Sequence, residues 1–174
     1  MNTNSLKILI IYIFGCYFIS GCTPTFDWRI LQQEESKWQA IFPSKPFKKN
    51  RKIILNVNAI PATLQMEQYS SMVEEISFTV DSSEILEEKI ELSKLSEILG
   101  KSLEKNFSLK NKKKLKNNIF QYEGTYSNSQ KSSIKIVLMT KTVLKKNVVV
   151  RGIVFAKLKK FSEDQALFFL SSIE

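Results

Sequence analysis

Four short apolar-rich segments occupy the first half of the chain, and in three of them hydrophobic and polar positions alternate at least in part, as in half-buried strands. They are residues 38–42, 52–60, 63–72 and 75–80. Pro43 and Pro46 each fix a backbone angle, so they predict a turn that stops the first segment, and Pro61 is expected to separate the second segment from the third. We therefore expect antiparallel strands here, and residues 75–80 show the alternation most clearly.

The apolar spacing becomes helical after residue 80. Residues 81–84 match a capping box, so we expect Asp81 to be the N-cap of a helix, with Glu84 reaching back to it. Five apolar residues at helical spacing form one stripe: Ile85, Leu92, Leu95, Leu99 and Leu103. Glycine costs about 1 kcal/mol relative to Ala inside a helix. Two outcomes therefore stay open, a helix that continues past Gly100 and a helix that ends there with Gly100 as its cap.

The second half returns to strands and closes with a helix. The strands are expected at residues 118–126, 133–144 and 148–158, with a hairpin turn at residues 145–147. The last two are apolar on both faces, which places them in the centre of a sheet with a helix on one side. A second capping box at residues 162–165 starts the terminal helix. Phe168 and Phe169 are adjacent there, so either one of them is exposed or at a partner contact, or the buried face is wide.

Together these elements predict an α+β fold, an antiparallel sheet with one long helix and a C-terminal helix packed on it. A chain of 174 residues suffices for one domain. We place that domain at residues 28–174, after a short tether at residues 22–27.

The amino terminus carries a separate signal. Residues 8–19 form an uninterrupted apolar run, preceded by one lysine and no acidic residue. Crossing the hydrocarbon core of a bilayer takes about 20 apolar residues, so this run is short for a permanent transmembrane helix. Its length and flanks are those of a cleaved signal peptide, which we expect at residues 1–21.

Ile19, Ser20, Gly21 and Cys22 follow the run, and they resemble the bacterial lipobox: a branched apolar residue, two small residues and the cysteine that receives lipid. The resemblance implies cleavage between Gly21 and Cys22, with Ile19, Ser20 and Gly21 recognised by the peptidase and a diacylglyceryl group on the Cys22 thiol. Two or three acyl chains give stable membrane attachment.

This interpretation predicts that the protein is in the bacterial cell envelope, lipid-anchored and facing the periplasm. In the enterobacterial pattern of these lipoproteins, an Asp after the lipidated cysteine favours inner-membrane retention. Thr23 stands at that position here, so the resemblance favours the outer membrane. Cys16 is the weaker lipidation candidate, because Phe14 precedes it where the motif has a small residue. Once Cys16 has left with the leader and Cys22 carries lipid, the mature chain has no free thiol and no disulfide.

Composition narrows the chemistry further. The chain has no histidine and only 5 glycines, which excludes histidine-dependent triads, histidine-ligated zinc and glycine-rich phosphate loops. Four adjacent acidic pairs are present, Glu34 with Glu35, Glu74 with Glu75, Glu87 with Glu88 and Glu163 with Asp164. Most fall where caps or exposed helix positions are expected, so we expect no enzyme, metal or cofactor; a hydrolase that uses carboxylates remains an alternative.

The net charge is +9, and its densest part is a lysine run, Lys110, Lys112, Lys113, Lys114 and Lys116. Two interpretations stay open, a solvated loop between strands and a contact with an anionic membrane surface. Nucleic acid is rejected as a partner, because arginine is scarce and nucleic acid lies on the other side of the membrane.

Three short motifs extend the resemblance to bacterial lipoproteins over the mature chain. They are residues 28–29 (Trp-Arg), 42–46 (Phe-Pro-Ser-Lys-Pro) and 168–172 (Phe-Phe-Leu-Ser-Ser). In this order they resemble small bacterial lipoproteins of unknown function. The resemblance implies a PsbP-like sandwich, an antiparallel sheet with helices on its faces, and it supplies no activity. We expect a non-catalytic binding or assembly-supporting role with an envelope protein as partner, or alternatively a small apolar ligand in a pocket between sheet and helix. The sequence does not indicate the oligomeric state.

Overall fold

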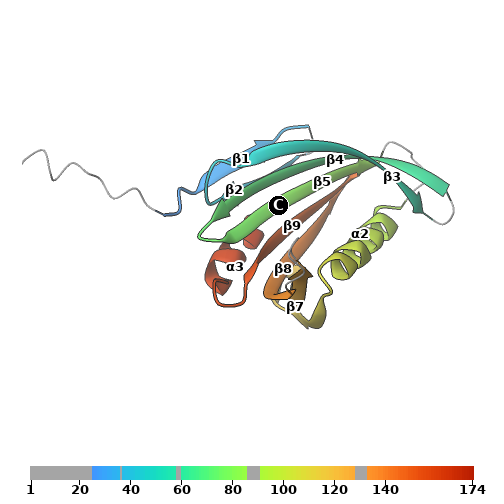
Figure 1. Cartoon of the computed structure of the whole chain (residues 1–174). Helices are drawn as coiled ribbons and strands as arrows, with labels where there is room; N and C mark the ends of the chain where they lie inside the picture. The colour runs from blue at the N-terminus through green and yellow to red at the C-terminus, as the bar shows by residue number, and fades with distance from the viewer. Residues whose placement is uncertain (1–24, 36, 58–59, 86–90, 128–132) are drawn as a thin grey trace, which may run out of the picture.

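The computed structural model describes residues 25–35, 37–57, 60–85, 91–127 and 133–174, and strands dominate it (Figure 1). The strands are β1 Arg29–Gln33, β2 Trp38–Phe42, β3 Phe47–Val57, β4 Ile60–Val73, β5 Ile76–Ile85, β6 Lys110–Lys114, β7 Ile119–Ser127, β8 Ser133–Lys145 and β9 Val148–Lys157. The helices are α2 Leu92–Asn106, the short 3-10 turn η1 Lys116–Asn118 and α3 Glu163–Ser171. An antiparallel sheet with two α-helices confirms the α+β class.

Seven strands form one antiparallel sheet in the order β3-β4-β5-β9-β8-β7-β6, and β1 pairs with β2 as a separate hairpin. Strand β9 is fourth of the seven, with β8 beside it, so the prediction that these two strands are central is confirmed. The hairpin lies close to the carboxyl terminus, because Gln39 and Glu174 exchange two backbone hydrogen bonds of 3.0 and 3.3 Å.

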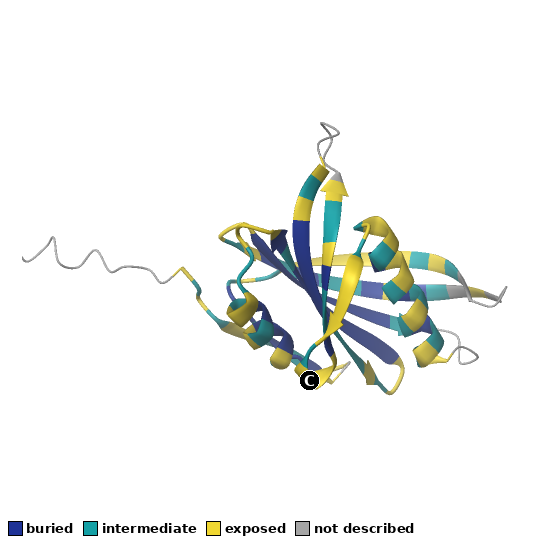
Figure 2. Cartoon of the chain, turned by 90° about the horizontal axis from the view of Figure 1, so that it is seen from below, coloured by how far each residue is buried: buried dark blue, intermediate teal, exposed yellow. Residues whose placement is uncertain are grey.

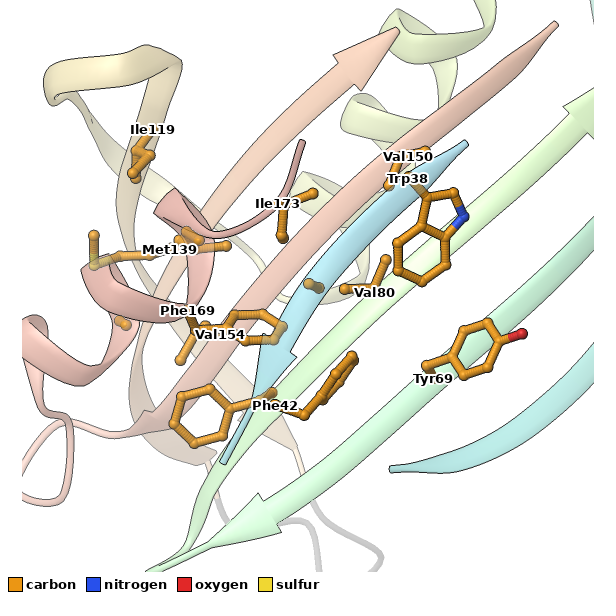
Figure 3. Packing of buried hydrophobic residues seen from close by; sticks show 14 of the residues in the cluster. Trp38, Phe42, Tyr69, Val80, Ile119, Met139, Val150, Val154, Phe169 and Ile173 are labelled. Atoms are coloured by element: carbon orange, nitrogen blue, oxygen red, sulfur yellow. The ribbon is translucent and has the colours of Figure 1, made fainter. Parts of the chain in front are cut away.

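The two faces of the sheet are covered by different elements, because side chains alternate along each strand. On the first, which we call the α3 face, the hairpin and α3 cover an aromatic core that includes Phe42, Phe78 and Phe169 (Figure 3). On the second, the α2 face, Leu95, Leu99 and Leu103 of α2 pack on the sheet. The fold is therefore three-layered, and the two helices cover opposite faces.

The expected helix start at Asp81 is wrong. Residues 81–85 continue β5, where Asp81 pairs with Arg151 of β9 and with Gln68 of β4. Strands on both sides supply the backbone hydrogen bonds that a helix would have made, and the Asp81 carboxylate binds Arg151 instead of a helix N-terminus. The helix begins later, at Leu92, after Glu91, whose side chain makes no capping hydrogen bond.

Gly100 lies inside α2, which continues to Asn106, so the first of the two open outcomes is correct. Ser162 precedes α3 as predicted, although its side chain makes no capping hydrogen bond. Pro61 does not separate the strands, because it lies within β4. There β4 pairs with β3 alone, since its pairing with β5 starts at Leu64, and a strand tolerates proline where only one side is paired.

Candidate binding site

The predicted lipidation signal, Ile19 to Cys22, lies outside the described residues. None of the helices in the described part of the chain is long and apolar enough to cross a bilayer.

The lysine run does not form the loop between strands that one of its two interpretations predicts. Residues Lys110–Lys114 form the edge strand β6, all five exposed and visible as a yellow strand in Figure 2. Lys112 lies 3.7 Å from Glu104 of α2 and over the Phe120 ring at 4.8 Å, while the ion pairs of the described residues do not include Lys110, Lys113, Lys114 or Lys116.

The opposite edge strand, β3, is also basic and exposed, with Lys48, Lys49, Arg51 and Lys52. Both edges of the sheet therefore carry repeated positive charge, a pattern that disfavours edge-to-edge pairing between molecules. This structural role explains the lysine run without a ligand.

A cleft lies between α2 and the sheet, with a volume of about 390 Å³. Apolar side chains from α2, β3, β4 and β9 form most of its wall: Ile53, Met66, Leu99, Leu103, Ile153 and Phe155. Ligand pockets in proteins are typically about 300 to 1,000 Å³ and mainly apolar, with a few polar groups. The volume and the lining of this α2 cleft both match that class.

A buried ion pair forms part of the polar lining of the α2 cleft. Arg151 Nη2 lies 3.1 Å from Asp81 Oδ2, and the two side chains are 10% and 7% exposed. Arg151 Nη1 donates to the backbone oxygen of Leu99 in α2 at 2.6 Å, and Gln68 donates to Asp81 at 2.9 Å. The pair therefore fastens the middle of α2 to β5 and β9. Its two charges compensate each other, and the exposed Arg51 adds a positive charge to the cleft lining.

A second hollow of about 310 Å³ lies on the other flank of α2 and also reaches Arg151. Gly100 borders it, and a methyl group added there would meet no atom within 4 Å. Burial raises the pKa of Tyr122 in its wall, an effect that the nearby Lys112 partly opposes, so this phenol stays protonated at neutral pH. Helix α2 thus contacts the sheet along a narrow apolar stripe, with space on both sides.

The acidic pairs do not converge on the α2 cleft. Glu34, Glu35, Glu74, Glu75, Glu163 and Asp164 are all exposed, and Glu87 and Glu88 lie outside the described residues. Glu75 forms ion pairs with Lys157 and Lys160, which hold its pKa below the usual range. In the described part of the chain, no group of three or more metal-ligating side chains occurs.

No family model matches the sequence, and no curated protein or solved structure matches it significantly. The fold and the geometry of the α2 cleft therefore carry the functional argument.

Sequence reasoning missed the Asp81 and Arg151 pair. The capping-box pattern predicts a helix N-cap at Asp81, and none of the sequence motifs includes Arg151. One signal was available: Arg151 interrupts an otherwise apolar segment, residues 148–156, and a charge within a buried strand needs a partner. The partner itself was not predictable, because it depends on the pairing of β5 with β9.

Proposed function

We propose that the protein is a lipid-anchored lipoprotein of the bacterial cell envelope that binds a small, mainly apolar ligand in the α2 cleft and catalyses no reaction. The lipid is attached to Cys22, and the domain faces the periplasm, with the outer membrane favoured over the inner. The arrangement of an antiparallel sheet with a helix on each face supports the PsbP-like sandwich that the sequence motifs imply.

The α2 cleft is the observation that carries the binding role. It has apolar walls on both the helix and the sheet, and its one buried carboxylate, Asp81, is already paired with Arg151. A carboxylate held in this way is poorly suited to general acid or base chemistry, which favours binding over hydrolysis.

The ligand is tested by filling the α2 cleft. Ser102 is exposed on α2 and borders the cleft, so Ser102→Trp places an indole in its mouth without removing a buried group. Ser93→Trp is the matched control, since Ser93 is exposed near the start of the same helix. We expect native mass spectrometry of the mature lipoprotein to detect a bound small molecule in the wild type and in Ser93→Trp, but not in Ser102→Trp. A ligand retained equally by all three proteins, or found in none, would contradict the proposal.

The anchor is tested separately through Cys22. We expect Cys22→Ala to abolish labelling by radioactive palmitate and to change membrane fractionation, because the thiol that receives the lipid is gone. Labelling and fractionation that match the wild type would refute the lipid anchor.

A further inference from the structure

The first described residues and several connections between elements lie at one end of the domain. Asp27 donates a backbone hydrogen bond to Pro43 at 2.8 Å, and the Trp28 ring lies 4.6 Å from that of Phe168 in α3. Glu75, in the β4 to β5 turn, pairs with Lys157 at the end of β9. We call this region the tether end, and Figure 1 shows the first described residues, the β4 to β5 turn and α3 together there.

Exposed hydrophobic side chains concentrate at the tether end. Large exposed hydrophobic residues in the described part of the chain are Ile30, Phe47, Ile54, Met72, Tyr126, Leu144, Leu158 and Phe168. Four of them, Phe47, Met72, Tyr126 and Leu158, lie at or next to strand ends on this side of the sheet, and Phe168 lies within α3. Phe168 is 49% exposed and forms one aromatic group with Trp28 and Phe26, whose rings stack at 5.6 Å.

Covalent geometry fixes how far this end can lie from a lipid on Cys22. Thr25 is the third residue after Cys22, and three extended residues span at most about 11 Å. The polar layer on each side of a bilayer is about 5 to 8 Å thick. Whatever path residues 22–25 take, Thr25 stays next to that layer, and the aromatic group begins one residue later.

We propose that the tether end is a membrane-contact surface, with the rings of Trp28 and Phe168 in the headgroup region of the bilayer that holds the lipid. This inference rests on the proposed anchor at Cys22. Aromatic residues are enriched at this depth because their rings favour the boundary between water and hydrocarbon.

Charges at the tether end argue for a contact made by the aromatic rings. Arg29 pairs with Asp27, and Lys157 and Lys160 share the single carboxylate of Glu75, so part of the positive charge is compensated within the end itself. Strand β6 leads away from the tether end, because Lys110 pairs with Glu123 and Lys114 with Phe120, near the start of β7. Strand β6 is therefore not the contact surface.

Three variants, each with a single introduced cysteine, distinguish membrane contact at the tether end from membrane contact through β6. The variants are Lys159→Cys, in the exposed turn after β9, Lys146→Cys, in the exposed turn before β9, and Lys114→Cys, at the end of strand β6. The first two are separated by the length of β9, about 30 Å. Each mature lipoprotein is labelled with a nitroxide, incorporated into phosphatidylcholine vesicles and probed by collision with a water-soluble nickel complex.

We expect the collision rate of the label at position 159 to be about tenfold lower than at position 146, with position 114 resembling 146. Equal, water-like rates at 159 and 146, or protection of 114 alone, would overturn the contact surface while leaving the anchor intact. The intact mass of each labelled protein separates the two proposals, because an unlipidated Cys22 takes up a second label. That result would remove the anchor and the contact surface together.

Discussion

The two faces of the seven-stranded sheet are built on different principles. On the α3 face, Phe169 contacts Phe42 and Phe78 edge to face, at ring distances of 5.1 and 5.4 Å. A side chain at Gly152 would come within 2.1 Å of Ile173, so the carboxyl-terminal segment packs on β9 with no spare room at this point. On the α2 face, two hollows flank the helix, and a charged pair is buried beneath it. The two faces therefore differ in packing: the α3 face is closely packed at Phe169 and Gly152, whereas α2 leaves space on both of its flanks.

The largest expected effect comes from the α3 face. Phe169→Ala removes a ring at 0% exposure from the aromatic core, and we expect the free energy of unfolding to fall by about 4 kcal/mol. Phe168→Ala is the control on the same helix, and its half-exposed ring should cost about 1 kcal/mol or less. Chemical denaturation of both variants measures the difference. Equal losses would show that the buried Phe169 ring contributes no more to stability than the half-exposed Phe168 ring.

The buried pair on the α2 face should have the next largest effect. Asp81→Ala leaves the Arg151 guanidinium buried without its carboxylate, and we expect a loss of about 3 kcal/mol in the free energy of unfolding. The double variant Asp81→Leu with Arg151→Met should lie within about 1 kcal/mol of the wild type, because both charges are removed together. A double variant as unstable as Asp81→Ala would mean that the hydrogen bond from Arg151 to α2 matters more than charge balance.

Replacing one glycine on each face by alanine compares how tightly the two faces are packed. Gly152→Ala forces a methyl against Ile173 and Leu170, and we expect a cost of about 2 kcal/mol in unfolding free energy. Gly100→Ala adds a methyl to a helix where no atom lies within 4 Å, and it should raise the unfolding free energy by about 1 kcal/mol. Thermal unfolding curves show whether each variant is more or less stable than the wild type. Effects of the same sign would contradict the described difference in packing.

The smallest effect concerns Glu67, which links β4 to the hairpin on the α3 face. Burial alone would raise the pKa of Glu67, but hydrogen bonds from Lys48, Tyr69 and Gln33 outweigh it and hold that pKa below the usual range. A lowered folded-state pKa means that the ionised carboxylate stabilises the fold above the unfolded-state pKa, about 4.3, and that this stability is lost as the pH falls through the folded-state value.

We therefore expect wild type to be more stable than Glu67→Gln at pH 6 and the difference to vanish towards pH 3. Denaturation midpoints of both proteins across this range provide the measurement. A difference that is constant with pH would show that the ionised carboxylate contributes nothing there.

Elements with a strong internal pattern could be predicted from the sequence. The alternation of Ile76, Phe78 and Val80 predicted their common buried face, and the apolar character of β8 and β9 predicted their central positions. The stripe of Leu92, Leu95, Leu99 and Leu103 predicted α2, although Ile85 belongs to β5.

What could not be predicted depends on partners distant in the chain. Asp81 resembles a helix cap until β9 brings Arg151 opposite to it, 70 residues later in the sequence. Lys110 to Lys114 resemble a loop, and only pairing with β7 makes them an edge strand. The α2 cleft likewise arises from the path of α2 across four strands, which no local pattern encodes.

The amino-terminal peptide of the mature protein tests the account most directly. Trypsin cuts after Arg29, so mass spectrometry of the protein purified from membranes reports on residues 22–29 as one peptide. The account predicts that this peptide begins at Cys22 and carries a diacylglyceryl group, with a further acyl chain on its amine. A peptide that continues into Gly21, or one with an unmodified Cys22, would contradict it.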